Sequence, residues 1–266
     1  MRSHKAVRVA TALAVICVLA ACSSDSTGPG EVDTFEWTGS VEAGDVVEIK
    51  GIIGSITATP SPDDQVRLFA TKRGVDDDPD TVDIDVVEHD GGVTICAVYP
   101  DVSGQPANEC LPGEGGFLSN GDNQVAVNFE VEVPDIAEFV GVTVAGSISA
   151  TGLVGDAQAT TVDGNVELQT DGQAGAVTVN GDVDADIGRS TWNRDLAFIT
   201  VNGDVTVRIP EDTDAVVTGA TVNGSVSTDF PLTISGDGRL MQGTLGDGGR
   251  LLTLTTVNGN VALRER

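Results

Sequence analysis

The pattern of apolar and polar residues in the second half of the chain repeats a short phrase, T-V-N-G-x-V. Its six copies read TVAGSI at 143–148, TVDGNV at 161–166, TVNGDV at 178–183 and 200–205, TVNGSV at 221–226 and TVNGNV at 256–261. After the third turn Val183, Ala185 and Ile187 alternate with aspartates, and before it Val177 and Val179 share one face. A period of two predicts half-buried β-strands on either side of each turn.

Two architectures use strand–turn–strand phrases of this kind. In a hairpin meander each Asn-Gly pair forms a type I′ turn between antiparallel neighbours. In a β-solenoid each pair forms one corner of a coil, and corners stack about 4.8 Å apart. Stacking gives every copy the same surroundings, which explains why Thr, Val, Asn and Gly all recur and predicts a ladder of hydrogen-bonded asparagines. The pattern therefore favours the solenoid over the meander.

Seven glycines are predicted to form the corners, because glycine adopts positive φ without a Cβ clash. They are Gly54 (in a degenerate copy, GIIGSI), Gly146, Gly164, Gly181, Gly203, Gly224 and Gly259. No segment beyond the N-terminus shows a sustained helical period, so the predicted fold class is all-β.

The pattern of apolar and polar residues in 32–134 predicts a β-rich N-terminal portion that is less regular than the repeats of 135–266. Its clearest strand is 125–133, where Val and Phe alternate with Ala, Asn and Glu until Pro134 ends the pattern. This portion is either a cap resembling a β-sandwich or a set of irregular coils of the same solenoid, and the pattern is compatible with both.

The first 31 residues differ from the rest. Residues 1–21 have a basic start and a short apolar run, which is typical of a secretory signal. They end in Leu-Ala-Ala before Cys22, which resembles the lipobox of bacterial lipoproteins and predicts a lipid anchor on Cys22; the alternative is a plain secretory signal or an uncleaved anchor. Two serines follow Cys22, which by resemblance to Gram-negative sorting favours the outer membrane. Residues 22–31 predict a flexible tether.

Charge restricts the partners. The chain has 14 Lys and Arg against 41 Asp and Glu, a formal net charge of −27, and three of the basic residues lie in the predicted signal segment. Such a surface repels phosphates, which excludes nucleic acid as a partner. It either attracts cations and basic partners or serves to keep strand edges soluble.

Cys96 and Cys110 are the remaining cysteines of the predicted mature chain apart from Cys22. In an oxidising compartment they predict a disulfide that stabilises the fold by roughly 3 kcal/mol in the chain-entropy model. A reactive pair is the alternative, but no His or Lys stands beside them to lower a thiol pKa.

Two insertions lengthen the repeats. The first, 188–198, places Trp192 between Arg189 and Arg194, a candidate ligand contact because sugars and cations dock on exposed aromatic rings. The alternative is that the ring folds over a corner while the arginines pair with local acids. The second, 227–250, is rich in Gly and Asp. It is a candidate Ca²⁺ loop, but it lacks the spacing of known calcium motifs, so no cofactor is predicted.

The predicted lipobox, GIIGSI, the strand ended by Pro134 and the repeats up to the closing GDGGRLLTLTTVNGNVALR together resemble the bacterial putative-adhesin domain family over residues 40–266. The resemblance implies a right-handed parallel β-helix, or β-solenoid, with an irregular β-rich N-terminal portion and a place in the cell envelope. It implies no catalytic residues, because the shared motif is structural.

The chemistry-bearing residues favour a non-enzymatic function. His89, the one histidine beyond the signal segment, is predicted to be a solvated turn residue, and no nucleophile elbow, P-loop or Cys/His cluster is present. The expected function is a cell-envelope lipoprotein that acts as an adhesin or scaffold and binds a glycan or protein. One alternative is a periplasm-facing structural protein. Another is a carbohydrate-active enzyme that uses outward acids such as Asp182, Asp184 and Asp204.

Overall fold

The computed structural model describes residues 32–266, so the predicted signal segment, Cys22 and the tether lie outside the described residues. As predicted, the described chain is all-β, with 23 strands and one 3₁₀ turn, η1 (Pro79–Thr81). Within this range no helix has the length and apolar character needed to cross a membrane.

The strands form two large sheets. Sheet A has ten strands, in the spatial order β1 (Val32–Ser40), β4 (Gln65–Arg73), β9 (Ala126–Val133), β3 (Ile56–Pro60), β11 (Ile148–Leu153), β13 (Val166–Thr170), β15 (Val183–Ile187), β17 (Val205–Ile209), β23 (Val261–Glu265) and β19 (Val226–Thr228). Sheet B has eleven, in the order β20 (Thr233–Ser235), β21 (Leu240–Leu245), β18 (Ala215–Asn223), β22 (Leu251–Asn258), β16 (Leu196–Ile199), β14 (Ala174–Val177), β12 (Ala157–Thr160), β10 (Glu138–Val142), β2 (Val46–Lys50), β6 (Gly92–Val98) and β5 (Asp83–His89). A separate hairpin joins β7 (Glu109–Cys110) and β8 (Gly116–Phe117).

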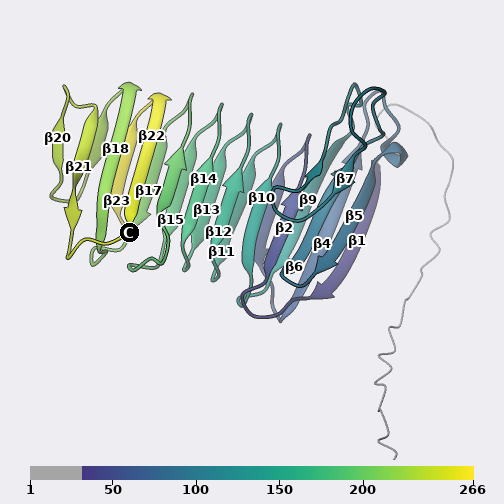
Figure 1. Ribbon diagram of the computed structural model, residues 1–266, viewed down its shortest axis with the longest axis horizontal. Coiled ribbons are helices and arrows are strands. Elements are labelled where there is room, and N and C mark those ends of the chain that lie inside the picture. Colours follow the sequence, from purple (N-terminus) through teal and green to yellow (C-terminus); the bar gives the residue numbers. More distant parts are fainter. Residues whose placement is uncertain (1–31) are drawn as a thin grey trace, which may run out of the picture.

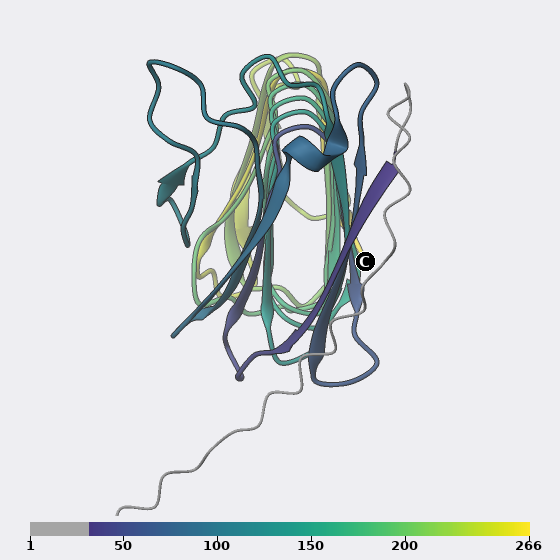
Figure 2. The same ribbon diagram turned by 90° about the vertical axis from the view of Figure 1, so that its right-hand side faces the viewer.

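Each Asn-Gly turn carries the chain from sheet B to sheet A. β14 precedes Asn180-Gly181 and lies in sheet B, whereas β15 follows it and lies in sheet A, paired in parallel with β13 and β17. One strand from each sheet therefore makes one coil, and the coils stack along the long axis (Figures 1 and 2). This excludes the hairpin meander, in which the two strands that flank a turn pair with each other.

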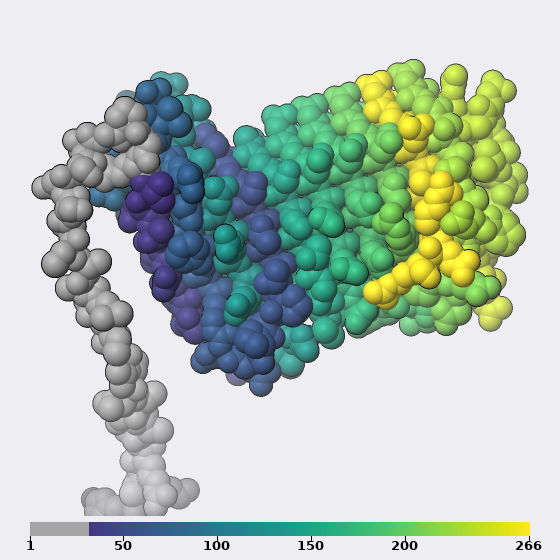
Figure 3. Space-filling model, turned by 180° about the vertical axis from the view of Figure 1, so that it is seen from behind, coloured from purple at the N-terminus to yellow at the C-terminus, as the bar shows by residue number. Residues whose placement is uncertain are grey.

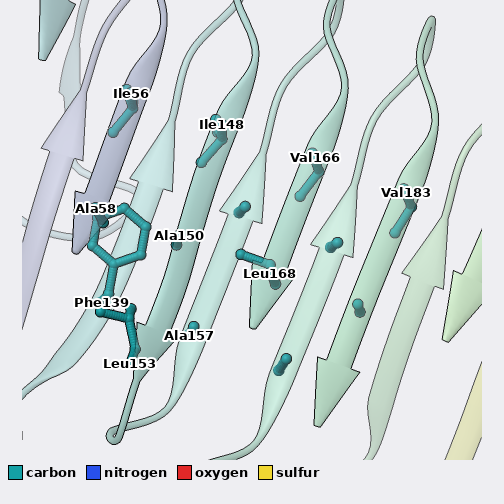
Figure 4. Packing of buried hydrophobic residues seen from close by; sticks show 14 of the residues in the cluster. Ile56, Ala58, Phe139, Ile148, Ala150, Leu153, Ala157, Val166, Leu168 and Val183 are labelled. Atoms are coloured by element: carbon teal, nitrogen blue, oxygen red, sulfur yellow. The ribbon is translucent and has the colours of Figure 1, made fainter. Parts of the chain in front are cut away.

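The core lies between the sheets and consists of columns of equivalent residues. Ile56, Ile148, Val166 and Val183 occupy the same position on successive strands of sheet A, and all four are buried (Figure 4). The predicted inward face of 183–187 is confirmed, since Val183, Ala185 and Ile187 are buried. Because each column repeats along the stack, every inner coil covers the apolar side chains of the next.

The valines before the turns do not belong to this core. Val177 and Val179 do share one face, but it is the outer one, and they are 38% and 37% exposed. Thr178 between them is buried instead, at 1% exposure. The strand alternation is therefore as predicted, but the polar residue faces inward, and the reason is a hydrogen bond described below.

The outermost coils are not the first and last in the sequence. At the C-terminal end β22 lies between β16 and β18, and β23 lies between β17 and β19. At the other end β2 lies between β6 and β10, and β3 between β9 and β11. Antiparallel strands complete both ends: β1, β4 and β5 at one, β20 and β21 at the other. Figure 3, which looks onto sheet A, shows the yellow C-terminal strand with yellow-green residues beyond it.

Candidate functional site

Buried threonines link the corners of successive coils. Thr178 donates its hydroxyl proton to the carbonyl oxygen of Gly164 at 2.9 Å, and Thr200 donates to that of Gly181 at 2.8 Å. The other copies of the phrase make the same bond, through Thr143, Thr161, Thr221 and Thr256. The hydroxyl of each buried threonine thus finds a backbone carbonyl oxygen as its partner at every corner, which explains why this inward position can be polar.

The predicted asparagine ladder is present. Asn202 donates through its amide nitrogen to Oδ1 of Asn180 at 2.8 Å, and Asn258 donates in the same way to Asn202 at 2.7 Å. Asn223 continues the ladder to Asn258 at 2.8 Å, and Asn180 donates to Asp163 at its other end. Each amide is both donor and acceptor, so one residue type suits every inner coil.

The acids of the repeats form a second ladder. Oδ1 of Asp182 accepts the backbone N–H of Asp204 at 2.8 Å, and Oδ1 of Asp204 accepts that of Asn260 at 2.7 Å. Asp184 accepts a hydrogen bond from Arg208 at 2.5 Å. All three acids that the carbohydrate-active alternative would use are therefore engaged in contacts that hold neighbouring coils together.

The corner glycines are needed because the coils approach each other closely. A Cβ on Gly203 would lie 2.0 Å from the carbonyl oxygen of Gly181, and across all seven corners such a Cβ would come within 1.8–2.1 Å of a backbone oxygen. The predicted reason, positive φ, applies to four of them: Gly54, Gly181, Gly203 and Gly259. It is wrong for Gly146, Gly164 and Gly224, whose φ is not positive. Steric exclusion is common to all seven.

The insertion after β15 folds against the stack. Trp192 is half-buried against the core, and its Nε1–H donates to the carbonyl oxygen of Arg189 at 2.8 Å. The guanidinium groups of Arg189 and Arg194 lie 3.9 and 3.5 Å from the carboxylate of Asp156, which also accepts the side-chain amide of Gln173 at 2.8 Å. This geometry matches the structural alternative for Trp192, because both arginines pair with a local acid and the ring lies on the protein.

The insertion at 227–250 extends sheet B through the antiparallel strands β20 and β21. Within residues 32–266 no three His, Cys, Asp or Glu side chains are grouped as metal ligands, in this insertion or elsewhere. The turns of the insertion are Gly-rich, and Asp237, with φ of 56°, is the one non-glycine residue of the described range at positive φ. The observed role of the insertion is to complete one end of the sheet.

The predicted disulfide between Cys96 and Cys110 is present, with Cα atoms 5.8 Å apart. It holds the loop 99–124 over the outer face of sheet B, where the loop stands out beside the stacked coils (Figure 2). Beneath the loop the Lys50 ammonium donates to the carbonyl oxygens of Leu111, at 2.7 Å, and Gly113. Both partners come from the loop, so the disulfide and Lys50 hold it at two points.

His89, the last residue of β5, is half-buried and hydrogen-bonded, whereas the sequence predicts a solvated turn residue. Its Nδ1 accepts the backbone N–H of Gly91 at 3.2 Å, so the proton is assigned to Nε2, which lies 3.2 Å from Oγ1 of Thr94. The Thr94 hydroxyl in turn donates to Oε2 of buried Glu48 at 2.9 Å. This chain of hydrogen bonds connects β5, β6 and β2, which is a structural role.

The burial of Tyr99 leads us to expect that the folded protein loses stability at alkaline pH. Tyr99 is the only tyrosine of the chain, its hydroxyl donates to the carbonyl oxygen of Val125 at 2.7 Å, and burial raises its pKa to about 12. Since the unfolded phenol has a pKa near 10, the neutral ring stabilises the fold fully below about pH 10, and this is lost as pH rises toward 12. Near-ultraviolet tyrosinate absorbance should therefore rise near pH 12, together with unfolding. A titration midpoint near pH 10 in the folded protein would contradict the expected burial.

A groove of about 350 Å³ opens on the outer face of sheet A, over β1, β4, β9 and β3. This face of the molecule is turned toward the viewer in Figure 3. Phe69 lies on β4, where it pairs with Glu36 on the neighbouring strand β1 and with Glu130 on the other neighbour, β9. The next row across the same strands consists of Thr38, Arg67, Glu132 and Thr59. An aromatic ring therefore lies on an open, otherwise polar surface between carboxylates and hydroxyls.

The polar groups of the groove have fixed positions. Arg67 donates to Oε2 of Glu132 at 3.0 Å and to Oδ2 of Asp63 at 2.5 Å, and the hydrogen bond from Arg67 lowers the pKa of Asp63 below its usual value. A ring bordered by such donors and acceptors suits a ligand with both apolar and hydroxyl-bearing faces. The sequence prediction missed this site because its residues come from separate segments. One signal was available: in QVRLFATKR the inward residues are Val66, Leu68 and Ala70, so Phe69 is the apolar residue out of phase.

Comparison with known proteins finds distant structural similarity. No family model matches the chain, and no curated protein matches it. A protein described as a putative cell adhesion protein from Clostridium sporogenes is 10% identical with a TM-score of 0.44, over 88% of this chain and 100% of that one. A putative adhesin from Bacteroides fragilis is 14% identical with a TM-score of 0.41, over 89% and 97% of the two chains. These values do not assign the chain to a family.

Proposed function

We propose that this protein is a non-enzymatic lipoprotein of the bacterial cell envelope, built as a right-handed β-solenoid, and that it acts as an adhesin that binds a glycan. The observation that carries the proposal is the groove around Phe69. Its ring lies between two carboxylates, with Arg67 and threonine hydroxyls in the neighbouring row. Sugar rings offer an apolar face for an aromatic ring and hydroxyl groups for such donors and acceptors.

The stacked coils support this function by holding the groove in one shape. β3 and β9, which form half of the groove, pair in parallel and continue into β11 and the ladders of the repeats. A surface that is already ordered loses little conformational entropy when it binds a ligand. The proposed lipid on Cys22 would attach this platform to a membrane, with residues 22–31 as the tether.

The glycan-binding proposal predicts a strong effect of Phe69→Ala. Loss of the ring should weaken glycan binding about tenfold or more, because buried aromatic anchors contribute most of the binding free energy in such sites. The full chain, purified in detergent, would be screened on a glycan array, and the best ligand measured by titration calorimetry. Trp192→Ala is the matched control, since that ring packs on the protein. Equal binding by Phe69→Ala and the parent, or a loss with Trp192→Ala alone, would refute the assignment.

The side of the membrane is tested by proteolysis of whole cells. An adhesin should be digested when intact cells are treated with proteinase K, and blotting for the mature chain would show its loss. A protein of the periplasmic compartment should be protected until the outer membrane is opened. Protection would favour the periplasm-facing structural alternative over adhesion.

A further inference from the structure

Three rows of outward positions on sheet B carry no charge across six consecutive coils. They cross β10, β12, β14, β16, β22 and β18 and the corners that follow these strands, and none of their 18 residues is Asp, Glu, Lys or Arg: Val140, Val142, Val144, Gln158, Thr160, Val162, Gly175, Val177, Val179, Ala197, Ile199, Val201, Thr253, Thr255, Val257, Thr218, Ala220 and Val222. The next row, away from the corners, does carry acids, with Glu138 on β10 and Asp156 and Asp195 directly before β12 and β16. We name the three uncharged rows the valine face; sheet B is turned toward the viewer in Figure 1. A chain with 21% charged residues would place about four charges on such a surface by composition alone.

A continuous stripe of valines borders this face. These residues are 37–57% exposed and stack in register along the corners: Val144, Val162, Val179, Val201, Val257 and Val222. The remaining outward positions of the face hold only Val, Ile, Ala, Gly, Thr and Gln. Contiguous exposed apolar area of this kind marks interaction surfaces in soluble proteins.

The opposite face of the same coils shows that the absence of charge is specific to sheet B. Outward positions of sheet A hold Glu167 on β13, Asp184 and Asp186 on β15, Arg208 on β17 and Arg264 on β23. Both faces have the same strand geometry and stacking. The difference therefore has to be explained by what each face contacts, not by what a strand of the stack requires.

We propose that the valine face is the docking surface for a second copy of this chain. With a formal net charge of −27, two copies that meet through an acidic face bring like charges together, whereas two valine faces meet without any charge in the contact. A strongly charged partner would find no complementary group on this surface. The dimer is independent of the glycan proposed for sheet A, because the two sites lie on opposite sheets.

The size of the face fits a weak dimer. Six strands about 4.8 Å apart and three outward positions about 6.8 Å apart cover roughly 600 Å² per copy, or about 1,200 Å² for both. This area reaches the lower limit of specific interfaces, where association is reversible. A dissociation constant on the order of micromolar is therefore expected.

The shape of the face leaves room for the valine stripe of a second copy. A hollow of about 190 Å³ lies where Gly175 and Ala197 provide little or no side chain, and Arg194 and Asp195, which lie just outside the valine face, line it as well. Gly175 is one outward position from Val177 along the chain and two from Val179 in the stripe. A two-fold axis over the column of Val177 places the valine stripe of one copy over the small residues of the other. Such an isologous contact closes at two copies and leaves sheet A of each copy free.

The test measures association of the full chain by sedimentation equilibrium in density-matched detergent. The parent should dimerise in the micromolar range, and Val177→Asp should weaken dimerisation at least tenfold by placing two carboxylates at the axis. Gln169→Asp is the matched control: this exposed side chain lies on the outer face of sheet A, and its change should leave association unchanged. Circular dichroism would verify folding, and Val179→Asp replaces Val177→Asp if the latter is unfolded.

Cysteine cross-linking in native membranes provides a second readout. Val177→Cys near the axis should give a disulfide-linked homodimer, whereas Gln169→Cys should not. A parent that stays monomeric at about 100 µM, an acid on the valine face without effect, or cross-links from Val177→Cys to a different envelope protein would each overturn the proposal.

Discussion

Replacement of Gly203 by alanine is expected to lower the free energy of unfolding by about 2–4 kcal/mol. The new Cβ would lie 2.0 Å from the carbonyl oxygen of Gly181, a backbone atom that cannot rotate away. Relief requires the two coils to separate, which weakens the bond from Thr200 to that same oxygen and the bond from the Gly181 N–H to the carbonyl oxygen of Asn202. The positive φ of Gly203, 154°, adds to the cost for any L-residue.

Gly175→Ala is the matched control for this change. A Cβ at Gly175 points from β14 to the outside and would meet only the carbonyl oxygen of Ala197, at 3.7 Å. The same added methyl group should therefore leave stability unchanged or raise it slightly, by less than about 1 kcal/mol. Urea unfolding followed by circular dichroism, at a protein concentration below the proposed dimerisation range, compares the two. Equal midpoints for both variants would show that corner packing does not restrict residue 203.

Loss of the disulfide has the second large effect. Replacement of both Cys96 and Cys110 by alanine is expected to cost about 3 kcal/mol, because the unfolded chain regains the freedom of a closed loop with a sequence separation of 14. The released loop would also uncover Lys50 and Glu48, which are 8% and 6% exposed and take hydrogen-bond partners from it. Thermal unfolding measures the combined loss.

Reduction distinguishes the covalent bond from the substitutions themselves. A thiol reductant should bring the melting temperature of the parent down to that of the double variant and leave the variant unaffected. If the parent keeps its melting temperature after titration shows both thiols to be free, the bond contributes little and the loop is held by its polar contacts alone.

The repeated phrase predicted the coils well because each of its residues contacts its own counterpart in the next coil. Asn202 bonds to Asn180, and Gly203 touches Gly181, so the periodicity of the sequence carries the contact directly. The groove around Phe69 has no such signature. Its neighbours Glu36 and Glu130 are brought together by strand pairing over long separations, and no local pattern specifies which strands pair. The outward direction of the valines was missed for another reason: a buried threonine reverses the simple rule that polar residues face solvent.

The position of β22 and β23 means that the coils do not stack in the order in which they occur along the chain. Residues 251–266 follow β18 to β21 in the sequence, yet they occupy an internal place between the coil of β16 and β17 and that of β18 and β19. Until they arrive, β18 and its antiparallel partners have no coil to stack on, and the edges of β16 and β17 remain open to pairing with other chains. Folding at this end is therefore completed only when residues 251–266 are in place, so a chain that lacks them would retain two unpaired sheet edges.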